Sequence, residues 1–148
     1  MNALPSQSRF IIGTEACERF SFYGMKSILM LYMTGHLLMS ENWATSTLHI
    51  FVGMVYLLPV AGAWLADKVW GRYKTILYIS LLYCVGHGVL ATADLFQTIE
   101  ARRYILMAGL LIIALGAGGI KPCVSAFMGD QIPDKSPRLM TKAFNAFY

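Results

Sequence analysis

The sequence predicts an all-α membrane protein, because apolar residues dominate the chain and gather in segments of helix length. Hydrophobic residues make up 57% of the 148 residues and charged residues only 14%. A soluble domain of this size needs more polar surface. Four segments can cross a bilayer as helices, at about 10–33, 47–66, 75–96 and 104–128, and a fifth begins near Lys142. Because the chain stops soon afterwards, we expect it to be part of a longer protein.

The basic residues between these segments predict how the helices are oriented. Arg102 and Arg103 lie on one side of the expected membrane. Seven basic residues lie on the side of the N-terminus: Arg9, Lys68, Arg72, Lys74, Lys135, Arg138 and Lys142. Loops rich in Lys and Arg stay in the cytoplasm, so we expect a multi-pass protein of the cell membrane with a cytoplasmic N-terminus. The net charge of +4 reflects these loops, and no nucleic-acid partner is expected.

The first segment contains the stretch "EACERFSFYG" at residues 15–24, which puts charges where a bilayer makes them costly. On a helix, Glu15, Glu18 and Arg19 fall on one stripe, which continues through Tyr23 and Lys26. Such a stripe has to face a bundle interior or a water-filled cavity. Two carboxylates beside one guanidinium leave an acid that can take up a proton. A Glu15–Arg19 salt bridge that only neutralises itself is the structural alternative.

The fourth segment carries one cation, Lys121, within "LLIIALGAGGIKPCVSAF". Glu18 lies roughly 12 Å from the inner end of its helix, and Lys121 roughly 10 Å from the inner end of its own. This matching depth predicts that Lys121 faces the charged stripe of the first helix. The combined charge is then zero and becomes +1 on protonation, which suits coupling to an anionic substrate group. The alternative is a lysine that reaches the cytoplasmic headgroups.

Two further patterns concern packing and the inner loop. Glycines of the fourth segment are expected to let neighbouring helices approach closely: Gly109, Gly116, Gly118 and Gly119. The turn "GAWLADKVWGRYKTI" joins the second and third segments, with Gly71 as the break. We expect Asp67 and Arg72 in this turn to serve a cytoplasmic gate or helix packing rather than substrate binding.

Taken together, these motifs resemble those of the proton-dependent oligopeptide transporter (POT) family. "EACERFSFYG" is similar to the family's first-helix motif, "GAWLADKVWGRYKTI" to its loop signature, "GAGGIKPCVSAFMGDQ" to its fourth helix and "FNAFY" to the start of its fifth-helix signature. The resemblance implies a major facilitator-type helical bundle, represented here by its first four transmembrane helices and the start of a fifth. It further implies a symporter that imports di- and tripeptides with protons by alternating access. The second, C-terminal bundle would lie outside this sequence.

The resemblance also implies roles for individual residues. Proton coupling is implied for Glu15, Glu18, Arg19 and His49, and substrate binding for Arg19, Tyr23, Tyr56 and Lys121. The loop motif is implied for Asp67, Gly71 and Arg72. Phe22 stands where the family motif has its first tyrosine, so a hydroxyl is lost in the expected binding cavity.

Other functions remain possible at this point. A family member could carry another solute such as nitrate, and a small stand-alone exporter of four helices would suit the length. An enzyme is not expected, because the sequence holds no nucleophile constellation or phosphate loop. No metal and no cofactor other than the coupling proton is expected, since Cys and His lack metal-ligand spacing. The expected partners are small peptides, the lipid bilayer and the remaining C-terminal half of the same chain.

Overall fold

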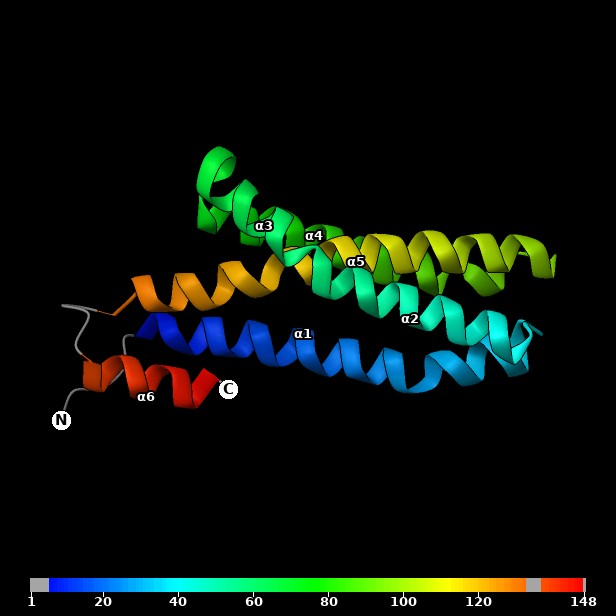
Figure 1. Ribbon diagram of the computed structural model, residues 1–148, viewed down its shortest axis with the longest axis horizontal. Coiled ribbons are helices and arrows are strands. Elements are labelled where there is room, and N and C mark those ends of the chain that lie inside the picture. The colour runs from blue at the N-terminus through cyan, green and yellow to red at the C-terminus, as the bar shows by residue number, and fades with distance from the viewer. Residues whose placement is uncertain (1–5, 133–136, 148) are drawn as a thin grey trace.

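The chain folds into long helices that run back and forth along one axis in the computed structural model, which describes residues 6–132 and 137–147 (Figure 1). The elements are α1 (Ser6–Leu31), η1 (Tyr32–His36), α2 (Glu41–Leu57), α3 (Pro59–Leu65), η2 (Ala66–Trp70), α4 (Arg72–Ala91), η3 (Ala93–Leu95), α5 (Ile99–Asp130) and α6 (Pro137–Phe147). Among the described residues, three continuous stretches are long and apolar enough to cross a membrane: Glu41–Trp70, Arg72–Leu95 and Ile99–Asp130. The first predicted span, at 10–33, lies mostly on the long helix α1 but is not among these stretches, because the charges of Glu15, Glu18 and Arg19 fall in the middle of this helix. The predicted class, an all-α membrane protein, is confirmed.

The helices begin and end at other residues than the apolar windows predict. The second segment, expected at 47–66, is helical from Glu41 to Trp70 apart from a break before Pro59, whose ring leaves the chain without a backbone donor. α5 extends the expected 104–128 at both ends, and α6 begins at Pro137 rather than near Lys142. Backbone hydrogen bonding continues through polar residues at helix ends, so hydropathy alone underestimates helix length.

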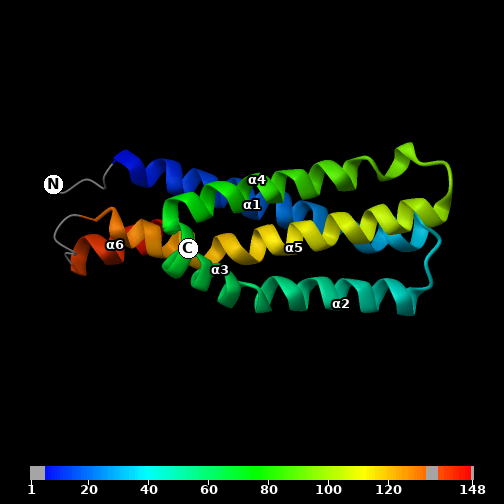
Figure 2. The ribbon, with the colours of Figure 1, turned by 90° about the horizontal axis from the view of Figure 1, so that it is seen from above.

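α5 lies at the centre of the bundle, with α4 on one side and α2 and α3 on the other (Figure 2). A Cβ added at Gly116 would lie 2.7 Å from Cβ of Tyr83, and one added at Gly62 would lie 2.5 Å from Cα of Gly119. At both places only glycine permits the observed separation of the helices. The expected close approach around the fourth-segment glycines is therefore confirmed, and it presses Tyr83 of α4 against α5.

The long helices alternate in direction, so the polar connections collect at two ends. The start of α1, η2 and α6 lie at one end, and η1 and η3 lie at the other (Figures 1 and 2). Arg9, Lys68, Arg72 and Lys74 belong to the first end, as the distribution of basic residues predicts. We refer to it as the basic end.

Replacing Gly116 by Ala is expected to destabilise the purified protein by about 1–3 kcal/mol, the usual cost of an overpacked contact. The added methyl group would overlap Tyr83, whose main chain also lies within 2.8 Å of it. Gly88→Ala on α4 is the matched control, because its added Cβ meets no atom within 4 Å. Thermal unfolding in detergent measures both. Equal melting temperatures for the two variants would contradict the packing described here.

Candidate functional site

Two glutamates and an arginine on α1 form a buried acid cluster, defined here as Glu15, Glu18 and Arg19. Glu15 and Glu18 are only 4% and 6% exposed. Arg19 Nε donates to Glu15 Oε1 at 2.8 Å, so the salt bridge that the sequence offered as the structural alternative does form. Among the described residues, Oε1 of Glu18 and the second oxygen of Glu15 have no hydrogen-bond partner. The salt bridge thus engages Glu15, whereas Glu18 remains a buried acid outside it.

The polar stripe of α1, which runs from Glu15 through Tyr23, is buried on one side and exposed on the other. At about 100° per residue, Glu18 and Phe22 lie on one side of Glu15, and Arg19 and Tyr23 lie on the other, with Tyr23 turned furthest away. Phe22 is accordingly buried, Arg19 is half-buried, and Tyr23 is 58% exposed. Tyr23 therefore lies at the edge of the stripe, where its ring is open to the space beside the described helices.

Lys121 of α5 reaches the face of α1 that carries the acid cluster. Its Nζ lies 5.1 Å from the centre of the Phe22 ring and 5.7 Å from that of Tyr56. Within the described residues Lys121 has no carboxylate oxygen within 4 Å, although its charge interacts with that of Glu18 over a longer distance. An ammonium over aromatic faces is stabilised by the ring quadrupoles. The lysine is thus held between two rings with its charge available to an anion.

The remaining side chains implied in substrate contact and proton coupling lie on α1 and α2. Tyr56 is 73% exposed and lies seven residues after His49, which places both on one face of α2. His49 is also exposed, and it makes no hydrogen bond or ion pair with the described residues. Tyr23 contacts Phe22 edge-to-face, with ring centres 5.6 Å apart. The structure therefore gathers Tyr23, Tyr56 and Lys121 around Phe22, and it leaves His49 two turns away.

A tyrosine that the sequence did not single out touches the acid cluster from α4. Tyr83 Oη and Ser21 Oγ are 2.8 Å apart, and both hydroxyls approach the main-chain oxygen of Glu18, at 3.3 and 3.0 Å. This three-atom arrangement ties the middle of α1 to α4. The sequence offered only a tyrosine in an apolar segment, a signal shared by many packing residues.

The loop motif at the basic end forms a charged junction between α4 and α5. Arg72 donates to a carboxylate oxygen of Asp130, and its Nε lies 3.9 Å from Asp67. Gly71, directly before α4, has φ +77°, a conformation that side chains other than glycine rarely adopt. Asp130, the last residue of α5, was missed because nothing in its sequence neighbourhood indicates that the loop folds back onto it.

A polar cluster at the opposite end was also missed. Asp94 accepts hydrogen bonds from the hydroxyl of Tyr32 at 2.8 Å and interacts with His36 Nε2 at 3.1 Å. Arg102 lies 3.9 Å from Asp94 and donates to the main-chain oxygen of Phe96 at 2.7 Å. These contacts join the end of α1 to the turn between α4 and α5. Both arginines that the sequence placed between two membrane segments lie in the first turns of α5.

The chemistry available at the site is therefore the binding of protons and anions. The described residues contain no group of three or more His, Cys, Asp or Glu side chains able to hold a metal ion. They do contain two buried carboxyl groups, a guanidinium bonded to one of them, and an ammonium held by aromatic rings. A carboxyl in an apolar bundle can be neutral or charged, and each state changes what its cationic neighbours can bind.

The sequence is similar to a known protein family and to curated relatives. The sequence model of a family described as the POT family matches residues 73–148. "Peptide transporter family 1" of Drosophila melanogaster is 47% identical over 146 residues, and human "Solute carrier family 15 member 2" is 42% identical over 146 residues. Each alignment covers 97% of this chain and 20% of the relative. The chain thus spans about a fifth of the length of these curated relatives.

Solved structures give the same grouping. The POT family transporter PepTSo, crystallised in meso, superposes with a TM-score of 0.87 at 45% identity, covering 99% of this chain and 29% of that one. An auto-inhibited POT family peptide transporter superposes with a TM-score of 0.86, also at 45% identity, covering 97% of this chain and 28% of that one. The arrangement of helices described above is shared with both.

Asp130→Asn is expected to lower the melting temperature more than Asp67→Asn, because Arg72 donates directly to Asp130 but only approaches Asp67. The ion pair is partly exposed and should contribute less than about 1 kcal/mol, so the shift should be about one or two degrees. Thermal unfolding at low and high salt measures it, and salt should reduce the difference. A larger shift for Asp67→Asn would contradict this, because it would mean that Arg72 interacts more strongly with Asp67 than with Asp130.

Proposed function

Because this chain belongs to the POT family, we propose that it works as part of a proton-coupled symporter that carries di- and tripeptides into the cell by alternating access. The names of the curated relatives, a peptide transporter and a solute carrier, support a peptide as the substrate. The chain spans about a fifth of those relatives, so the remaining helices of the full-length transporter contribute the rest of the pathway. We place the N-terminus in the cytoplasm, which puts the basic end on the inner side of the membrane.

This proposal rests on two neighbouring side chains, the buried acid Glu18 and the half-buried cation Lys121. Glu18 lies outside the Glu15–Arg19 salt bridge, and Lys121 is held by aromatic rings rather than by a carboxylate among the described residues. With both acids ionised, two negative charges balance the two positive charges of Arg19 and Lys121. One proton on Glu18 leaves a net charge of +1, which favours an anion beside Lys121.

That anion is, in our proposal, the carboxylate of the peptide. Lys121 supplies a point charge, and the half-buried guanidinium of Arg19 supplies further donors near it. Tyr23 and Tyr56 border Lys121 with largely exposed rings, so they offer apolar surface and hydroxyl groups to the peptide backbone. His49 stands two turns away along α2 and would take up a proton in the outer part of the pathway.

The transport cycle then follows from electrostatics. A proton that enters from outside neutralises Glu18, ends its attraction for Lys121, and lets the lysine bind the peptide carboxylate. Loss of that proton on the cytoplasmic side restores the attraction and weakens peptide binding, so that proton and peptide leave together. The junction of Asp67, Arg72 and Asp130, with Gly71 as its turn, would hold the cytoplasmic gate between these two states.

The full-length transporter, reconstituted in vesicles, tests the proposal. We expect an inward proton gradient to raise dipeptide uptake in the wild type. Glu18→Gln mimics the protonated acid, so concentrative uptake should be lost while counterflow exchange of peptide continues. Glu41→Gln, an exposed acid at the start of α2, is the matched control and should transport normally.

Two results would contradict the proposal. Wild-type uptake that is indifferent to pH, or that nitrate inhibits and dipeptides do not, would exclude proton-coupled peptide transport. A Glu18→Gln variant that still concentrates peptide against a gradient would assign the proton to another group, with Glu15 and His49 as the next candidates.

A further inference from the structure

A cavity of about 650 Å³ lies beside the acid cluster, between α1, α4 and α5. Glu18, Ser21, Ser80 and Tyr83 line its polar part, and we call this part the hydroxyl pocket. Two buried oxygen atoms of the pocket, Oε1 of Glu18 and Oγ of Ser80, have no hydrogen-bond partner among the described residues. Glu18 is 6% exposed, so little of its surface is in contact with bulk solvent.

The other two hydroxyl groups of the pocket are already engaged. The hydroxyl oxygens of Ser21 and Tyr83 lie 2.8 Å apart, and each lies within hydrogen-bond distance of the main-chain oxygen of Glu18, at 3.0 and 3.3 Å. They fix the α1 backbone at Glu18 relative to α4, and their oxygen atoms keep lone pairs for a further donor. The pocket thus combines two unsatisfied oxygens with a rigid polar wall.

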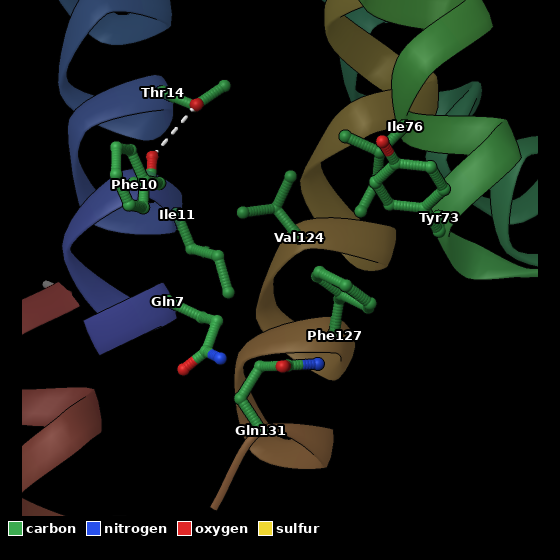
Figure 3. Close-up of a pocket in the computed structure, with 9 residues that line it drawn as sticks. All are labelled: Gln7, Phe10, Ile11, Thr14, Tyr73, Ile76, Val124, Phe127 and Gln131. Atoms are coloured by element: carbon green, nitrogen blue, oxygen red, sulfur yellow. Dashed lines mark hydrogen bonds between the residues drawn. The ribbon is translucent and has the colours of Figure 1, made fainter. Parts of the chain in front are cut away.

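Buried polar atoms of this kind are normally satisfied by water when the space allows it. A buried water needs two to four polar partners and a volume of about one probe sphere, and both conditions are met here. A neighbouring cavity shares Phe10 and Thr14 with this one and has two glutamines in its lining, but no charged side chain among the described residues (Figure 3). Apolar side chains such as Ile11 and Val124 line it, and the Thr14 hydroxyl already donates to the main-chain oxygen of Phe10 at 2.9 Å.

We propose that the hydroxyl pocket binds water between Glu18 and Ser80, and that this water exchanges the coupling proton with Glu18. Ser80 and Tyr83 of α4 are then positioning residues for proton transfer. A hydronium ion in the pocket gives its proton to the Glu18 carboxylate, which leaves a water molecule and a neutral carboxyl group. The reverse step returns the proton to water. This inference rests on the proposed role of Glu18 as the proton-binding acid.

Charges from three directions act on this exchange. Glu15 and Arg19 flank Glu18 on α1, and Lys121 faces it from α5. Tyr83 approaches it from α4, and Arg9 lines the same cavity nearer the basic end. The positive charges favour the ionised carboxylate, whereas Glu15 opposes it. Water in the pocket therefore adds hydrogen-bond donors to the charged form of Glu18, whose Oε1 has no donor among the described residues.

The test compares Ser80→Ala and Tyr83→Phe in the full-length transporter with two matched controls. Ser27→Ala removes a hydroxyl on the exposed side of α1, and Tyr78→Phe removes one from an exposed ring of α4 that packs on Trp70. All four proteins are reconstituted in vesicles at equal folded amounts. The pH dependence of gradient-driven dipeptide uptake and counterflow exchange at a fixed acidic pH are then measured.

Loss of a hydroxyl that holds the pocket water should weaken the hydrogen bond from this water to the ionised Glu18, so Glu18 should hold its proton more tightly. We expect the pH of half-maximal uptake to rise by roughly one unit in Ser80→Ala and Tyr83→Phe, the effect of one hydrogen bond to a charged group. Concentrative uptake should fall several-fold, while exchange at acidic pH and both controls stay close to the wild type. Unchanged pH profiles, or equal losses of uptake and exchange, would overturn the proposal and make the pocket purely structural.

The variants separate this inference from the function on which it rests. If Glu18→Gln loses concentrative uptake but Ser80→Ala and Tyr83→Phe behave as the wild type, only the water pocket is wrong. If Glu18→Gln also transports normally, the role of Glu18 itself is wrong. A high-resolution structure of the full-length transporter gives an independent measure. Water density within hydrogen-bond distance of Glu18 Oε1 and Ser80 Oγ is expected, and a side chain filling the pocket would overturn the proposal.

Discussion

The burial of two carboxyl groups within an apolar helix bundle is the constraint on which the rest of this structure depends. An ionised carboxylate removed from water is costly unless cations and hydrogen bonds compensate it. Glu15 receives such compensation from Arg19 on its own helix, at 2.8 Å. Glu18 has no equally close cation among the described residues and interacts with Lys121 over a longer distance. The two neighbouring acids thus differ in how closely a cation compensates them, and on this difference we base the proposal that Glu18 exchanges the coupling proton.

The packing of α5 makes this electrostatic arrangement possible. The glycines of α5 allow α3 and α4 to approach so closely that an added methyl group would overlap them. This approach sets the position of Tyr83, whose hydroxyl reaches the main chain of Glu18. It also fixes Lys121 at a depth where its ammonium meets Phe22 and Tyr56. The close packing of helices in the middle of the bundle therefore determines which side chains surround the acid cluster.

Much of the fold and part of the site could be predicted from the sequence. Apolar segment length gives the helices, and the spacing of Glu15, Glu18 and Arg19 places them on one side of α1. The matching depth of Glu18 and Lys121 predicted that the lysine faces α1. Depth alone does not determine where its side chain points, and the lysine contacts aromatic rings rather than a carboxylate. Contacts such as Arg72 with Asp130, or Tyr83 with Ser21, join residues about 60 positions apart. They depend on helix rotation and loop geometry, which no local pattern encodes.

The most direct test of the central claim is the affinity of the full-length transporter for a dipeptide and for its C-terminal amide, with and without Lys121. If Lys121 receives the peptide carboxylate, the wild type should prefer the free acid by more than about tenfold, since one hydrogen bond to a charged group contributes about 1.5–3 kcal/mol. In Lys121→Ala this preference should largely disappear, whereas Lys74→Ala, which changes an exposed lysine, should retain it. A Lys121→Ala variant that loses affinity for both ligands equally would contradict the account.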